Sequence, residues 1–253
     1  MAGQIISVDR ILDKLDEYLG RNNYASAERH LKYWLGEAET ASDHRTELLV
    51  SNELMGLYRK LGRREEALER AKKALARIEE LNIGKQVGAA TTFLNCATVF
   101  KAFGDPEGSI ELFKRAESIY LSELDADDSR LGGLYNNMAL TLVDLCRFGE
   151  ADAAYRKALD IMAKNKGGDL EVAITYLNMA SAAEAELGLL DADERIQEYM
   201  DRAEALLDLH AERDGYYAFV CEKCASVFEY YGRFTYSKEL NERSRRIYLR
   251  EGN

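Results

Sequence analysis

Three asparagines recur along the chain at nearly equal spacing. Asn95, Asn137 and Asn178 follow one another at steps of about 42 residues, although asparagine is not a favoured residue inside a helix. A side-chain amide both donates and accepts hydrogen bonds, so a row of amides can bridge the N–H and C=O groups of an extended peptide. The alternative is that these asparagines cap helices or cross-link neighbouring ones. Both interpretations require an architecture that places equivalent positions side by side.

The other residue types that often carry chemistry do not form a convergent site. Cys221-x-x-Cys224 has the spacing of a metal or redox pair, but a zinc site commonly takes a second such pair and the sequence holds none. We expect both cysteines to pack in the core, and Cys146 to be the more exposed thiol. The three histidines are not at metal-ligand spacing, and no nucleophile elbow or phosphate loop occurs. We therefore expect a protein that is not an enzyme and uses no cofactor or metal.

The overall composition narrows the classes of partner. The 253 residues include 34 Lys and Arg against 45 Asp and Glu, a formal charge of −11 that disfavours binding to nucleic-acid phosphates. No run of eighteen apolar residues exists that would cross a membrane. Acidic residues interrupt the N-terminal segment, where a signal peptide needs an apolar run. We expect a cytoplasmic protein that binds neither nucleic acid nor membrane.

The elements that position these residues form a repeat of about 42 residues. The turn positions Gly62, Gly104 and Cys146 are evenly spaced at this step. Apolar residues at i, i+3, i+4 and i+7, as in 135–142, indicate one buried face of a helix in each unit, and the period-two alternation of strands is absent. In the first unit, Gly20 fits the 42-residue step, but the apolar residues fit a 40-residue step. We follow the apolar register, because burial contributes more than one turn glycine.

The repeat resembles the tetratricopeptide repeat family. The family's G-x-x-Y-x-x-x-G-x-x-x-x-A pattern corresponds to Met55, Tyr58, Gly62 and Ala67, to Ala97, Phe100, Gly104 and Ser109, and to Ala139, Leu142, Cys146 and Ala151. The long step, together with NNMALTL and AYRKALDIM, is similar to the kinesin-light-chain type of repeat, whereas the usual family unit has about 34 residues. The resemblance implies an all-α fold, a right-handed α-solenoid superhelix of about six helix hairpins. Their first helices are expected to line a concave groove.

The repeat also sets the expected domain organisation. We expect residues 1–253 to form a single superhelical domain with units at about 5–43, 48–83, 88–124, 130–165, 169–209 and 215–251. Asp105, Pro106 and Glu107 have the residue types of an N-cap, a first helical position and an acidic first turn. The fifth unit is expected to have a longer second helix, roughly 191–209.

In each first helix, the stripe beside the buried face is expected to face the groove. The predicted peptide-binding residues are Asn52, Arg59, Asn95, Thr98, Lys101, Asn136, Asn137, Asn178 and Ser181. Arg59 and Lys101 share one position, where units five and six carry Glu184 and Glu229, so an anionic part of a ligand is expected near units two and three. The alternative is that these charges form a solvated surface. The carboxylate clamp of chaperone-binding family members is not matched, because Thr91 and Asn95 occupy the positions of its basic pair.

The resemblance implies a non-catalytic scaffold that captures a segment of a protein or peptide partner in the groove. The sequence does not specify the identity of that partner. Two alternatives stay open: a peptide-sensing regulator that changes shape on ligand binding, and an assembly module that forms a homodimer through the C-terminal unit. Four tyrosines near the C-terminus either cover the last core face or contact a second copy; they are Tyr216, Tyr217, Tyr230 and Tyr231.

Overall fold

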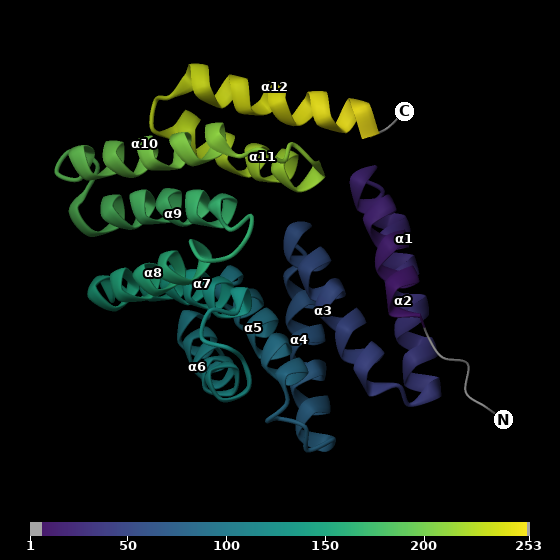
Figure 1. Cartoon of the computed structure of the whole chain (residues 1–253). Helices are drawn as coiled ribbons and strands as arrows, with labels where there is room; N and C mark the ends of the chain where they lie inside the picture. Colours follow the sequence, from purple (N-terminus) through teal and green to yellow (C-terminus); the bar gives the residue numbers. More distant parts are fainter. Residues whose placement is uncertain (1–6, 252–253) are drawn as a thin grey trace. The chain divides into compact units, whose positions relative to one another are not determined.

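The computed structural model describes residues 7–251, and their side chains up to residue 249. Every regular element in this range is an α-helix, as predicted, and the helices pair into six antiparallel hairpins (Figure 1). Two compact units divide the chain at residue 123. Unit 1 contains α1 (Val8–Gly20), α2 (Tyr24–Ala41), α3 (His44–Lys60), α4 (Arg64–Glu80), α5 (Val87–Ala102) and α6 (Pro106–Glu123). Unit 2 contains α7 (Ser129–Asp144), α8 (Phe148–Met162), α9 (Asp169–Leu187), α10 (Asp193–Leu209), α11 (Gly215–Tyr230) and α12 (Phe234–Glu251).

Each hairpin turns at one residue with a left-handed backbone. These residues are Asn22, Gly62, Gly104, Cys146, Gly188 and Gly232, with φ between 53° and 87°. In five of the hairpins the next N–H closes the turn on a carbonyl five residues back, as in Arg147 N to Leu142 O at 2.8 Å. The three steps from Gly62 to Gly188 are 42 residues each, and the first step is 40, so the first turn lies at Asn22 rather than Gly20, as the apolar register predicted. Glycine adopts this conformation without a Cβ clash, so Asn22 and Cys146 are the strained members of the series.

Side-chain caps fix where several helices begin. The carboxylate of Asp43 accepts a hydrogen bond from Thr46 N at 3.1 Å, and that of Asp214 accepts one from Tyr217 N at 2.9 Å. The predicted cap at Asp105 is confirmed, because its Oδ1 accepts from Gly108 N at 2.8 Å and Pro106 is the first residue of α6. The helix predicted over roughly 191–209 is α10 (Asp193–Leu209), but it is not longer than the second helices α4 and α6. α10 has 17 residues, and the extra length belongs to α9, which has 19.

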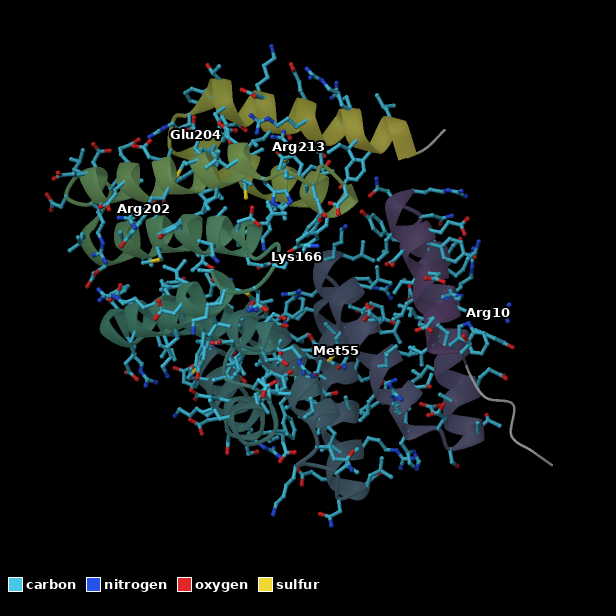
Figure 2. All side chains as sticks on the ribbon, in the orientation of Figure 1. Arg10, Met55, Lys166, Arg202, Glu204 and Arg213 are labelled. Carbon is cyan, nitrogen blue, oxygen red and sulfur yellow. The ribbon has the colours of Figure 1, made fainter. Side chains whose placement is uncertain are left out.

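Each unit has a core of its own between its paired helices. In unit 1, Met55, Phe93 and Phe113 are fully buried, whereas Lys166 and Arg202 of unit 2 extend from its surface (Figure 2). Helices α9 to α12 share one apolar cluster. Cys221 and Cys224 lie inside this cluster, as predicted, and burial raises the pKa of the Cys224 thiol to about 12. No helix within residues 7–251 is long and apolar enough to cross a membrane.

Candidate functional site

A groove of about 630 Å³ lies between the first helices α3 and α5 of unit 1. Apolar side chains form much of its lining, and polar groups stand among them on both helices. The lining residues are His44, Arg45, Leu48, Leu49, Asn52, Glu53, Leu81, Ile83, Gln86, Gly88, Ala89, Thr91 and Asn95. The volume falls in the range of sites that hold a small ligand or a few side chains of a peptide.

Helical spacing explains how the sequence builds this groove. On α3, Arg45, Leu48, Leu49 and Asn52 follow one another at intervals of one helical turn or less, so they share one face. Val50, on the opposite face of α3, is fully buried. The connection between α4 and α5 contributes Leu81 and Ile83, which add apolar surface at the side of the groove.

The amide of Asn52 links the two walls of the groove. Its Nδ2 donates to Thr92 Oγ1 at 3.3 Å, and the Thr92 hydroxyl donates to the Gly88 carbonyl at 3.2 Å. Asn52 Oδ1 is buried and receives no hydrogen bond within the described part of the chain. An unsatisfied buried acceptor costs about 1–3 kcal/mol, so this oxygen favours any arrangement that brings a donor to it.

Two charged side chains stand at separate places along α3 in the groove. Glu53 is half-buried and forms no ion pair with the residues that the structure describes. Burial raises the pKa of the Glu53 carboxyl, and the negative charge of Asp16 on α1 raises it further. Arg45 is exposed near the start of α3. The pKa of the capping Asp43 carboxyl is lowered. Burial alone would raise it, but the hydrogen bonds from Thr46 and the positive charge of Arg45 outweigh that effect.

Nearby charges on the same helix are compensated within the fold. Arg77 Nε donates to Glu47 Oε2 at 3.1 Å, and its Nη2 lies 3.1 Å from His44 Nδ1. Glu47 is therefore neutralised by a neighbouring arginine, in contrast to Glu53. The two carboxylates of α3 stand in different electrostatic environments although they belong to the same helix.

The structure brings together only some of the predicted binding residues. Asn52 and Asn95 line the groove, and the Asn95 side chain is half-buried. Thr98 is 8% exposed and donates to the Asn95 carbonyl at 2.8 Å, so its hydroxyl is used within α5. Arg59 is exposed and Lys101 is half-buried, and neither contributes to the groove lining.

The predicted binding residues of unit 2 make contacts within that unit. Asn178 Nδ2 donates to Asn136 Oδ1 at 3.1 Å, which ties α9 to α7. Asn137 Nδ2 donates to the Gly133 carbonyl at 2.8 Å, one turn earlier in α7. The exposed Ser181 hydroxyl donates to Leu177 O at 3.3 Å. All of these polar side chains thus bond to their own helix or to a neighbouring first helix.

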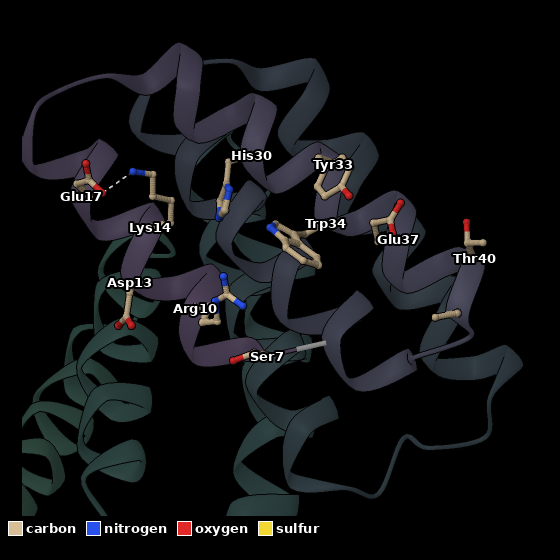
Figure 3. A pocket seen from close by; sticks show the side chains of 11 residues that line it. Ser7, Arg10, Asp13, Lys14, Glu17, His30, Tyr33, Trp34, Glu37 and Thr40 are labelled. Carbon is tan, nitrogen blue, oxygen red and sulfur yellow. Dashed lines mark hydrogen bonds and ion pairs between the residues drawn. The ribbon is translucent and has the colours of Figure 1, made fainter. Parts of the chain in front are cut away.

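A second groove, which sequence reasoning missed, lies on the first hairpin. It has a volume of about 790 Å³ between α1 and α2. The rings of His30 and Trp34 and the side chain of Arg10 point into it (Figure 3). His30 Nε2 lies 2.9 Å from the Ile11 carbonyl, and the Tyr33 ring, 59% exposed, meets Trp34 edge-on at 5.2 Å. The one tryptophan of the sequence was the available signal, but composition alone does not distinguish a core tryptophan from a groove tryptophan.

The tyrosines near the C-terminus serve two purposes. Tyr217 is fully buried, which confirms a core role for this member of the set. Tyr216 and Tyr230 are exposed, yet their hydroxyls donate to Glu171 and Glu184 of α9, the latter at 2.8 Å. The tyrosine hydroxyls therefore tie the first helix of the last hairpin to the first helix before it.

Paired helices in tandem, with an open groove between successive first helices, define a helical-repeat protein of the α-solenoid class. Family models described as tetratricopeptide repeat match residues 47–122 and 133–165. The chain therefore carries tetratricopeptide repeats over these two segments. No curated protein sequence matches it.

Two solved structures illustrate the shared fold. BtubC (BKLC) from P. vanneervenii is 21% identical, with 92% of each chain covered and a TM-score of 0.58. A Podospora anserina protein of kinesin-light-chain type, with nearly identical TPR-like repeats, is 18% identical with a TM-score of 0.55. In this second case the match covers 82% of this chain and 97% of the other. The fold similarity agrees with the repeat type that the 42-residue step predicted.

Proposed function

We propose that the protein is a non-catalytic scaffold that captures a segment of a protein partner in the α3/α5 groove. The observation that carries the proposal is an apolar groove on two successive first helices, with Asn52 and Asn95 on its walls. Tetratricopeptide repeats generally mediate protein–protein interaction, which supports a protein ligand over a small molecule. A cytoplasmic location and one superhelical domain over residues 1–253 stay predictions.

The groove offers both components that peptide recognition needs. Leu48, Leu49 and Ile83 provide surface on which partner side chains lose contact with water. Two side chains of leucine size contribute about 3–6 kcal/mol from burial, before the cost of association. Asn52 and Asn95 then supply amide groups for the backbone of the segment.

The asparagines divide between two roles in this proposal. Asn52 and Asn95 contact the ligand, whereas the Asn136–Asn178 hydrogen bond holds two first helices of unit 2 together. Sensing through a change of shape and self-association through the last hairpin stay alternatives. Solution scattering with and without a bound peptide tests the first alternative, and sedimentation over a range of protein concentrations tests the second.

A blocked variant tests the proposal directly. A Cβ added at Gly88 meets no atom within 4 Å, so Gly88→Trp is chosen to direct a ring into the groove from an unhindered position. Gly149 on α8 of unit 2 has the same open surroundings, and Gly149→Trp is the matched control. Both changes replace glycine within a helix and are expected to keep or slightly raise the melting temperature.

The probe is a phage-displayed library of random twelve-residue peptides selected on the full chain. Peptides from this selection are expected to lose at least tenfold in affinity for Gly88→Trp and to keep their affinity for Gly149→Trp. Fluorescence polarisation with labelled synthetic peptides gives both values. Equal affinity for the wild type and Gly88→Trp would place the peptide elsewhere and refute the proposal.

A further inference from the structure

We propose that the α3/α5 groove selects partner segments in which apolar residues lie beside a lysine or arginine, with the cation held at Glu53. The inference rests on the proposed function and specifies the chemical class of the ligand. It commits to a peptide with a basic residue, because the groove already contains a negative charge that the fold does not pair.

The two carboxylates of α3 differ in whether a cation pairs with them. Glu47 is buried and lies within 3.1 Å of the Arg77 guanidinium. Glu53 is half-buried in the groove lining and forms no ion pair within residues 7–251. Since carboxylates removed from water are normally paired, Glu53 is the position in this groove at which an added cation gains most.

A second carboxylate strengthens the same preference. Asp16 on α1 lies close enough for its charge to act on Glu53, and it too has no ion pair among the described residues. A cation near both carboxylates reduces their mutual repulsion, in addition to its attraction to each.

The apolar lining suits the stem of a long basic side chain. Leu49 and Leu48 lie about one turn before Glu53 on α3, so a lysine or arginine can pack its methylene groups there while its charge reaches the carboxylates. Aspartate or glutamate at the same place meets two like charges. The groove therefore both favours a basic residue and opposes an acidic one.

The positive charge of Arg45 at the start of α3 sets the expected spacing of charges in the ligand. Arg45 precedes Glu53 by about two helical turns, or about 12 Å along the helix axis. An extended peptide covers that distance in about four residues. We therefore expect an acidic residue about four positions away from the basic one, with apolar residues between them.

The test compares three chains with the same random twelve-residue phage library. Peptides selected on the wild type are expected to carry Lys or Arg at a fixed position beside apolar residues. A representative peptide is expected to lose about tenfold in affinity on Glu53→Gln, the size of one charge-assisted hydrogen bond. Glu39→Gln changes an exposed glutamate of α2 outside the groove, and is expected to have no effect.

A charge exchange completes the test and separates it from the proposed function. Replacing the basic residue of the peptide by glutamate is expected to abolish binding to the wild type and to restore it on Glu53→Lys. Circular dichroism melting verifies that each variant is folded. Peptides that Gly88→Trp blocks, but that show no basic preference and bind Glu53→Gln as tightly as the wild type, overturn this inference and leave the groove in place. Peptides that Gly88→Trp does not affect overturn both.

Discussion

The hydrogen bond between Asn136 and Asn178 is predicted to stabilise unit 2. Asn136 is only 9% exposed, and its Oδ1 accepts from Asn178 Nδ2 at 3.1 Å. Asn178→Ala removes the donor and leaves a buried carbonyl oxygen without one, which costs about 1–3 kcal/mol. For a chain of this length, each kcal/mol lowers the melting temperature by about 2–4 °C. We expect a decrease of roughly 2–12 °C.

A double-mutant cycle isolates the contribution of this pair. Asn136→Ala, Asn178→Ala and the double variant are compared with the wild type by urea denaturation followed by circular dichroism. The double variant is expected to be less destabilised than the sum of the single variants, with a coupling energy of about 0.5–2 kcal/mol. Asn137→Ala is the matched control, because its amide bonds to a carbonyl of its own helix.

One result would refute the reasoning. Single variants as stable as the wild type, combined with a loss of peptide binding, would mean that these amides serve the ligand and not the contact between α7 and α9. The structural interpretation then fails for unit 2, and the sequence-based ladder of asparagines regains support.

The remaining predictions concern pH, one turn and one glycine. A hydrogen bond from Arg63 lowers the pKa of the Glu28 carboxyl from 4.5 to about 2, and its side chain is 17% exposed. The ionised Glu28 carboxylate thus contributes at most about 3 kcal/mol to the free energy of unfolding above pH 4.5, and this contribution is lost as the pH falls towards 2. Glu28→Gln should therefore make the stability less dependent on pH between these values. The same pH dependence in the variant and the wild type would contradict this prediction. Cys146 has a left-handed backbone with φ 56°, which glycine adopts without strain. Cys146→Gly should therefore raise the free energy of unfolding by about 0.5–1 kcal/mol, measured by thermal melts. A lower melting temperature would show that this backbone conformation carries no strain. A Cβ at Gly168 collides with the Met162 carbonyl oxygen, so Gly168→Ala should cost about 1–3 kcal/mol in urea denaturation, and a neutral result means that the loop adjusts freely.

Much of the fold could be predicted from the sequence because local signals repeat. The turn positions and the small apolar residues recur with one period, and each signal has a local cause in backbone conformation or helical spacing. The start of α6 followed from Asp105 and Pro106 alone. The end of the fifth hairpin's first helix was harder to predict, because its glycine turn at Gly188 uses a different hydrogen-bond pattern from the others.

The candidate site was predictable only in part. Helical spacing predicted the same role for Asn52, Asn95 and Asn178, but the first two line a groove and the third bonds to Asn136. Periodicity gives the face of a helix on which a residue lies, and not which neighbouring side chain its amide meets. The groove also depends on Leu81 and Ile83, which lie in a connection outside the repeat pattern. The difference between paired Glu47 and unpaired Glu53 arises from contacts with α1 and α4 that no local pattern encodes.

The side-chain amide signals of asparagine test the central claim most directly. Spectra of the ¹⁵N-labelled full chain are recorded with and without a peptide selected from the random library, and single Asn→Gln variants assign the NH₂ signals. We expect the signals of Asn52 and Asn95 to shift on peptide addition, while those of Asn137 and Asn178 stay in place. Shifts at Asn137 and Asn178 with none at Asn52 and Asn95 would contradict that claim.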